Sequence, residues 1–217
     1  CIEIIKSRIT DGYLDDAPIW SEVRTFRSDN PECSQFISEL ATLDNLVVTA
    51  GFPCQPFSQA GHKRGAADQR NGWPNTLRII RETKPCTVLL ENVPGLLTGS
   101  RYFGQILSDL AESGYDARWK VVSAAELGAP HRRARLWIVA HARGQRLERS
   151  RAIWQQEPFK RSQTPQFERR GENTRWWCAE PGVGRVAHGV ACRVDKLRAL
   201  GNGWVPAVAE AAWAWLR

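Results

Sequence analysis

The chain has 217 residues, 42% of them hydrophobic, which suits one α/β domain with a small insert or one and a half domains. A formal net charge of +7 favours a polyanionic partner such as nucleic acid. No apolar stretch approaches the length of a membrane span, and no signal-peptide pattern is present. The six cysteines form no C-x-x-C pair, so neither a zinc site nor a disulfide scaffold is indicated and reduced cytosolic thiols are expected.

The first residues lack the usual start of a natural protein. The chain begins with Cys1 and contains no methionine. The opening Cys1-Ile2-Glu3-Ile4-Ile5 resembles the middle of an element. We therefore expect the natural protein to have residues before Cys1.

Apolar runs and helical periods then alternate along the chain. The continuous apolar run Val88-Leu89-Leu90 suits a strand buried on both faces, as in a parallel sheet. The alternation predicts an α/β fold with a doubly wound sheet. The expected strands are 46–50, 87–92, 118–123 and 135–141, and the expected helices are 33–42, 74–84, 101–113 and 205–216.

The stretch 143–182 differs from the rest, because it is rich in Arg, Gln, Glu and Pro and has no clear period. By itself it is typical of a solvated loop. We interpret it as an irregular basic insert that divides the chain into a core over 1–142 and a C-terminal segment over 183–217 that returns to the core.

One cysteine stands directly after a predicted strand. Residues 51–58 read Gly-Phe-Pro-Cys-Gln-Pro-Phe-Ser and follow the apolar run 46–50. In α/β folds, ligands and catalytic residues lie at strand ends. The two prolines restrict the conformations of the loop that carries Cys54. Two interpretations remain open from these residues alone: a presented nucleophile or a buried structural cysteine.

Three further motifs lie near predicted strand or helix ends. Glu91 begins the motif Glu-Asn-Val-Pro-Gly at the end of one strand, and Arg133 and Arg135 lead into another. In an extended chain those two arginines point the same way. A glycine turn, Gly201-Asn202-Gly203, opens the final helix. Each motif alone has an ordinary explanation as a strand end, a surface patch or a turn.

In this order, the motifs resemble those of the C5-cytosine-specific DNA methyltransferases, particularly the compact phage and bacterial type. The resemblance implies a Rossmann-like methyltransferase sheet with a short target-recognition insert. Its strongest blocks are Pro53-Cys54-Gln55, Glu91-Asn92-Val93, Arg133-x-Arg135 and Gly201-Asn202. The matching segments are 46–61, 70–97, 127–142 and 185–217.

The resemblance implies a covalent mechanism on a cytosine flipped out of the duplex. Cys54 matches the nucleophile that adds to C6 of the base. Glu91 matches the carboxyl group that donates a proton at N3, which requires a raised pKa. Arg135 matches the residue that holds O2, and Arg133 the one that supports the cysteine loop and the flipped nucleotide.

The resemblance also implies contacts with double-stranded DNA. The basic insert at 143–182 occupies the target-recognition position, so its Arg and Trp side chains are expected to touch DNA. Arg185 lies in the segment that organises this region, where a structural role is also open. The loop expected to close over the flipped base supplies the remaining predicted DNA contacts, Gln55, Ser58, Lys63 and Arg64.

The implied cofactor is S-adenosyl-L-methionine, but its side of the site departs from the family pattern. The glycine-rich loop that opens the family's motifs is absent, and Gly72 stands where a leucine usually packs on adenine. Trp204 replaces a small or β-branched residue. We therefore predict weak or no cofactor binding by this chain. The matching cofactor positions are Glu3, Glu22, Pro53, Gly72, Asn202 and Gly203.

The resemblance further implies a monomer in the cytoplasm of a bacterial or phage-infected cell, with no metal or membrane and with a cognate restriction endonuclease as a functional partner. Two alternatives stay open. Besides a DNA cytosine methyltransferase, the chain could be a catalytically decayed remnant that still binds DNA, or an RNA-cytosine methyltransferase of the same fold.

Overall fold

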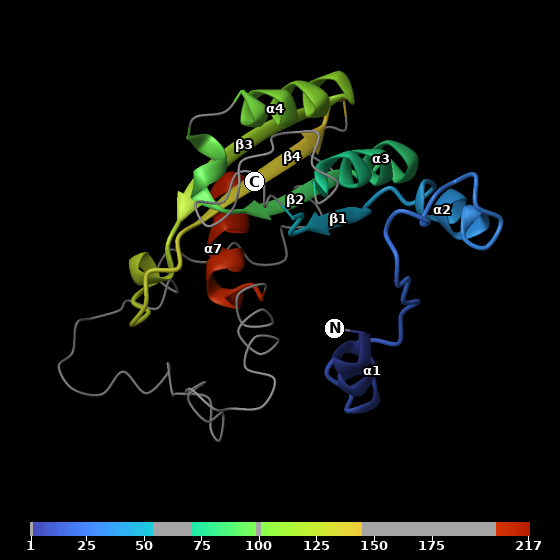
Figure 1. Ribbon diagram of the computed structural model, residues 1–217, viewed down its shortest axis with the longest axis horizontal. Coiled ribbons are helices and arrows are strands. Elements are labelled where there is room, and N and C mark those ends of the chain that lie inside the picture. The colour runs from blue at the N-terminus through green and yellow to red at the C-terminus, as the bar shows by residue number, and fades with distance from the viewer. Residues whose placement is uncertain (1, 54–70, 99–100, 145–202) are drawn as a thin grey trace.

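The computed structural model describes residues 2–53, 71–98, 101–144 and 203–217 (Figure 1). Strands and helices alternate through the middle of the chain, with short 3-10 turns at Pro94–Leu97 and Ala124–Leu127. The strands are β1 (Val47–Ala50), β2 (Thr87–Asn92), β3 (Tyr115–Val122) and β4 (Arg135–Ala142). The helices are α1 (Ile2–Thr10), α2 (Ser34–Leu40), α3 (Trp73–Thr83), α4 (Tyr102–Glu112) and α7 (Pro206–Leu216).

The strands form a sheet in the order β1-β2-β4-β3. β1 and β2 are parallel, with Ala50 beside Leu90, whereas β4 is antiparallel to both β2 and β3. The expected parallel arrangement therefore holds only for β1 and β2. A run buried on both faces indicates that helices cover both faces of a sheet, but it does not determine the direction of the neighbouring strand.

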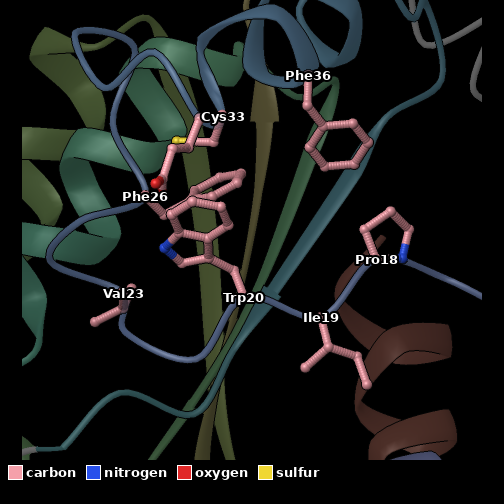
Figure 2. A pocket seen from close by; sticks show the side chains of 8 residues that line it. Pro18, Ile19, Trp20, Val23, Phe26, Cys33 and Phe36 are labelled. Carbon is pink, nitrogen blue, oxygen red and sulfur yellow. The ribbon is translucent and has the colours of Figure 1, made fainter.

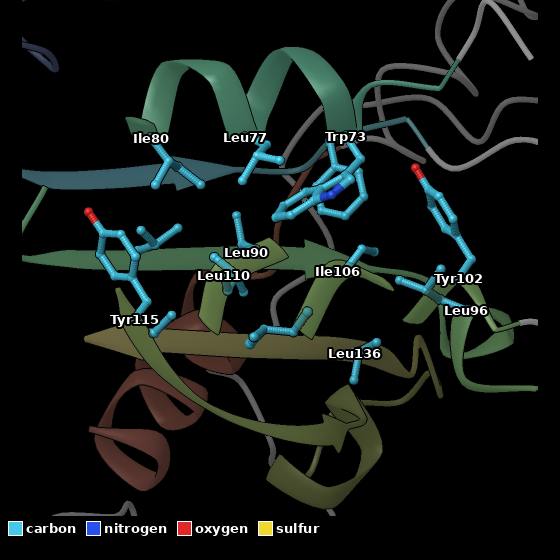
Figure 3. Close-up of a cluster of buried hydrophobic side chains, with 14 residues drawn as sticks. Trp73, Leu77, Ile80, Leu90, Leu96, Tyr102, Ile106, Leu110, Tyr115 and Leu136 are labelled. Carbon is cyan, nitrogen blue, oxygen red and sulfur yellow. The ribbon is translucent and has the colours of Figure 1, made fainter. Parts of the chain in front are cut away.

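Helices cover both faces of this sheet. α3 and α4 pack on one face, where Trp73, Leu77 and Ile80 point toward the strands (Figure 3). α7 packs on the other face through Val208, Ala212 and Leu216. The sidedness follows from the alternation along β2, where Val88 and Leu90 join the first cluster and Leu89 joins the second. The predicted α/β, doubly wound class is confirmed.

The helices begin and end where local chemistry favours it. α3 has Pro74 in its first turn, where a missing N–H costs nothing, and ends at Lys84 in the left-handed region. α7 likewise begins at Pro206. α1 was not predicted as a helix and buries none of its residues, and Figure 1 draws it apart from the sheet. Within the described ranges, no helix has both the length and the apolarity to cross a membrane.

Candidate active site

The candidate site lies at the carboxyl ends of β1 and β2. Because these strands are parallel and Ala50 pairs with Leu90, Gly51 leaves the sheet beside Glu91. β4 is antiparallel, so its first residue, Arg135, enters the sheet at the same edge. The topology thus gathers three segments far apart in sequence at one place.

An ion pair forms the centre of this edge. Arg135 Nε lies 2.8 Å from Glu91 Oε1, and the two side chains retain only 21% and 14% of their exposure. The Arg135 guanidinium also donates to the carbonyl of Ala134 at 2.9 Å. A pair this sheltered is screened less than a surface pair, so each partner restricts the orientation of the other.

Arg133 reaches the same place by an unexpected backbone route. Its φ of 32° lies in the left-handed region, which a non-glycine residue rarely adopts, and β4 begins only at Arg135. The extended chain expected across both arginines is therefore wrong. Even so, both line one small pocket with Glu91, and Arg133 donates to the carbonyl of Gly203. Backbone conformations of this kind gather at functional sites.

Trp204 completes the surroundings of the carboxylate. Its indole nitrogen faces Oε2 of Glu91 across Gly51, and this contact lowers the pKa of Glu91. The ring meets Trp137 edge to face, with ring centroids 5.0 Å apart. Nothing in the sequence motifs indicated that Trp204 lies beside Glu91, because the two residues are far apart in the sequence and only the fold brings them together.

Burial controls the protonation of this group. Removal from water raises the pKa of Glu91 above its usual value, and the positive charges of Arg135 and Arg133 oppose that shift without cancelling it. Burial, together with the charge of Arg135, lowers the pKa of Arg133. A carboxyl group with a raised pKa at the ligand edge of an α/β sheet is suited to proton transfer.

The base of the loop that leads to Cys54 is firmly attached to β2. Asn92 is 4% exposed, and its side-chain amide donates to the carbonyl of Phe52 at 3.1 Å. Phe52 is buried in turn against Trp73, with ring centroids 5.3 Å apart. The residue after Glu91 therefore holds the start of the cysteine loop, a role that the sequence motif did not reveal.

Gly72 holds the same loop base from the other side. Its N–H donates to the carbonyl of Pro53 at 3.0 Å, and a Cβ at this position would lie 2.6 Å from Pro53 Cδ. Only a residue without a side chain permits this approach. The structure thus places Gly72 and Pro53, both predicted cofactor contacts, against each other directly before Cys54.

We expect Asn92→Ala to destabilise the protein, because the buried carbonyl of Phe52 would lose its partner. The expected loss of unfolding free energy is about 1–3 kcal/mol. Urea denaturation would measure it. Gln105→Ala is the control, since it removes an exposed amide contact to Asp109 within α4 and should cost under about 0.5 kcal/mol. Equal losses in the two variants would contradict the assigned role of Asn92.

The predicted acidic cofactor residues lie elsewhere. Glu3 is on α1, 3.7 Å from Lys6, with 88% of its side chain exposed. Glu22 accepts a hydrogen bond from the backbone N–H of Arg24 at 3.1 Å. The neighbours of Glu22, Trp20 and Val23, line an apolar pocket of about 470 Å³ (Figure 2). Its other lining residues are Pro18, Ile19, Phe26, Glu32, Cys33 and Phe36.

Several predicted site residues lie outside the described residues, so their roles remain predictions. The same holds for almost all of the expected basic insert at 143–182. The site residues concerned are Cys54, Gln55, Ser58, Lys63, Arg64, Arg185 and Asn202.

Comparison with known proteins identifies the class. Residues 24–179 match the family of C-5 cytosine-specific DNA methylases, and the chain belongs to this family. The Type II methyltransferase M.BsuFI of Bacillus subtilis is 43% identical over 106 residues, which are 48% of this chain and 26% of that protein. M.NgoMIV of Neisseria gonorrhoeae is 38% identical over 96 residues, or 43% and 31% of the two chains. The matches thus span about a third or less of these relatives.

Among solved structures, the Entamoeba histolytica methyltransferase EhMeth aligns with 64% of this chain and 42% of its own. The identity is 21% and the TM-score is 0.47.

Proposed function

We propose that this chain forms the catalytic part of a DNA (cytosine-5-)-methyltransferase, which methylates C5 of a cytosine flipped out of duplex DNA. The observation that carries the proposal is the sheltered pair of Glu91 and Arg135, beside the strand whose loop leads to Cys54. At this sheet edge, the carboxyl group can donate a proton to the cytosine ring, and the guanidinium can donate a hydrogen bond to the O2 oxygen of the same ring. Membership of the cytosine methylase family supports the same chemistry.

Covalent attack makes the unreactive C5 position nucleophilic. The thiolate of Cys54 adds to C6, and the displaced π electrons move toward N3 and O2. Glu91 gives its proton to N3 while Arg135 donates to O2. S-adenosyl-L-methionine, the donor generally used by this family, would when bound supply an electrophilic methyl group for C5 and leave as the neutral thioether S-adenosylhomocysteine. A base then removes the C5 proton, and the electron pair of that C–H bond restores the C5–C6 double bond as the C6–S bond breaks. N3 returns its proton to Glu91, which regenerates the acid.

The pKa of Glu91 suits this role. The raised pKa keeps more of the carboxyl group protonated near neutral pH than a solvated glutamate would be. Because proton donation needs the protonated form, methyl transfer should fall as the pH rises through this pKa.

The apolar pocket beside Glu22 fits the adenine portion of the methyl donor. Its volume of about 470 Å³ lies within the usual range for small-molecule sites, and the rings of Trp20 and Phe26 offer surfaces for a planar base. Glu32 supplies a polar group at its lining. Glu3 is exposed on α1 and paired with Lys6, and it does not line this pocket.

Transfer of a labelled methyl group tests the proposed function. The full-length protein would be incubated with methyl-labelled S-adenosyl-L-methionine and an equimolar mixture of duplex DNA and tRNA. We expect the label in DNA, recovered as 5-methyldeoxycytidine after digestion. Label confined to tRNA would indicate an RNA enzyme. Label on another base, or DNA binding without transfer, would equally overturn the proposal.

We expect Arg135→Met to reduce kcat by about 10²–10³-fold, the scale of losing one donor to a developing oxyanion. The variant would also leave a sheltered carboxylate without its cation, so the pKa of Glu91 should rise further. Steady-state kinetics on duplex DNA would measure the loss. Arg143→Met is the control, because its pair with Asp116 is exposed and distant from the site. A kcat within twofold of wild type, or the same loss in both variants, would contradict the role of Arg135.

A further inference from the structure

Glu91 is held from two directions. One carboxylate oxygen, Oε1, lies 2.8 Å from Arg135 Nε in an ion pair. The other oxygen, Oε2, lies beside Gly51, where an added Cβ would be 3.3 Å from it and 3.2 Å from Trp204 Nε1. The indole and the carboxylate therefore share the space that a side chain at position 51 would fill. A guanidinium and an indole from different segments thus flank the carboxyl group, and together they restrict its plane more than either could alone.

The indole itself is held in place. Trp137, which supports it edge to face, is 1% exposed at the centre of the sheet. The carbonyl of the preceding residue, Gly203, accepts from Arg133. Val205 follows as the residue that caps α7. The direction of the Trp204 N–H is thus determined by the core rather than by an exposed side chain.

We propose that Trp204 is a positioning residue, which orients the Glu91 carboxyl group for proton donation to the pyrimidine ring. This inference rests on the proposed function. The C-terminal segment thereby takes part in the chemistry by placing the indole nitrogen beside Oε2 of the acid, without touching the base itself.

The positioning role of Trp204 predicts a specific change in how kcat depends on pH. Trp204, like Arg135 on β4 and Arg133 in the preceding loop, stabilises the ionised form of Glu91 and so lowers its pKa against the effect of burial. Trp204→Phe removes the indole N–H and keeps an aromatic ring beside Trp137. The pKa of Glu91 should then rise, and the falling limb of the pH–kcat profile should move to higher pH.

The kinetic test compares Trp204→Phe with Trp215→Phe in the full-length protein acting on duplex DNA. Trp215 lies on α7, is 43% exposed and contacts Lys120, so it provides the same chemical change away from Glu91. We expect kcat at the optimum to fall roughly 10- to 100-fold in Trp204→Phe with little change in KM, together with the shifted limb. Trp215→Phe should match wild type. A lower kcat with an unshifted limb, or the same loss in both variants, would overturn the proposal.

A second readout does not depend on activity. Infrared spectra of protein with isotope-labelled glutamate would be recorded against pH. Subtracting the spectra of the Glu91→Gln variant isolates the titration of the Glu91 carboxyl group. We expect its midpoint to move to higher pH in Trp204→Phe, and an unchanged midpoint would refute the contact. If wild type transfers no methyl group to cytosine while the midpoint moves, the proposed function fails and the positioning contact stands.

Gly51→Ala serves as the second variant if Trp204→Phe does not fold. The added methyl group would press between the indole nitrogen and Oε2 without removing either partner. The Glu91 midpoint should move in the same direction, toward higher pH, and no movement in a folded Gly51→Ala protein would count against the proposal.

Discussion

Cys54→Ala is expected to abolish methyl transfer while leaving DNA binding intact. Without the sulfur, no covalent bond to C6 can form, and C5 of the cytosine stays unreactive. Removal of a covalent nucleophile typically lowers kcat by on the order of 10⁴–10⁶-fold. The rest of the loop base should persist, because Asn92 and Gly72 hold Phe52 and Pro53 by their backbone carbonyls. A single-turnover assay with labelled cofactor would measure the loss.

Binding of the same variant to duplex DNA separates catalysis from recognition. Phosphate contacts by basic side chains supply most of the affinity and do not involve the thiol, so the dissociation constant at a given salt concentration should match wild type. Cys86→Ala is the control, since Cys86 is a free cysteine directly before β2, at the opposite end of that strand from Glu91. Full activity in Cys54→Ala would contradict the nucleophilic role, whatever happens to binding.

Glu91→Gln should reduce kcat by about 10²–10⁴-fold, the usual contribution of a positioned acid. Glutamine has the same shape and keeps an oxygen for Arg135, but it cannot give a proton to N3. The falling limb of the pH–kcat profile should disappear with it, because the group with the raised pKa has gone. The measurement is kcat against pH on duplex DNA.

Glu82→Gln provides a matched control. Glu82 pairs with Arg78 on α3 at 3.2 Å, and both side chains are 18% exposed, so this pair is about as sheltered as that of Glu91 and Arg135. The control should keep wild-type kcat and its pH limb. A Glu91→Gln enzyme that retained the limb would show that another group donates the proton.

Secondary structure in the middle of the chain could be predicted closely. The expected strand 87–92 matches β2, and the expected helix 74–84 differs from α3 by one residue at each end. These elements carry strong signals, namely a continuous apolar run and a proline at the first turn. α1 carried a weaker signal, because Ile2, Ile5 and Ile9 have helical spacing over a short segment, whereas Ile4 falls on another face.

The site was predictable only where chemistry lies in a short motif. The Glu91 motif and the arginine pair could be recognised locally, and the fold brings them together at one sheet edge. The contact of Trp204 with Glu91 could not be foreseen, since residue 204 reaches residue 91 only through the packing of α7 on the sheet. The role of Gly72 could not be foreseen for a similar reason, because its approach to Pro53 depends on how the base of the loop folds.

Trapping on DNA that contains 5-fluorocytosine tests the central claim most directly. Fluorine at C5 cannot leave as a proton does, so the bond between the protein and the base should persist after methyl transfer. We predict an adduct of the full-length protein that survives denaturation, requires S-adenosyl-L-methionine and maps to Cys54 after proteolysis. Cys54→Ala should form none. An adduct that persists in Cys54→Ala, or none in a wild-type protein that methylates ordinary cytosine, would contradict the account.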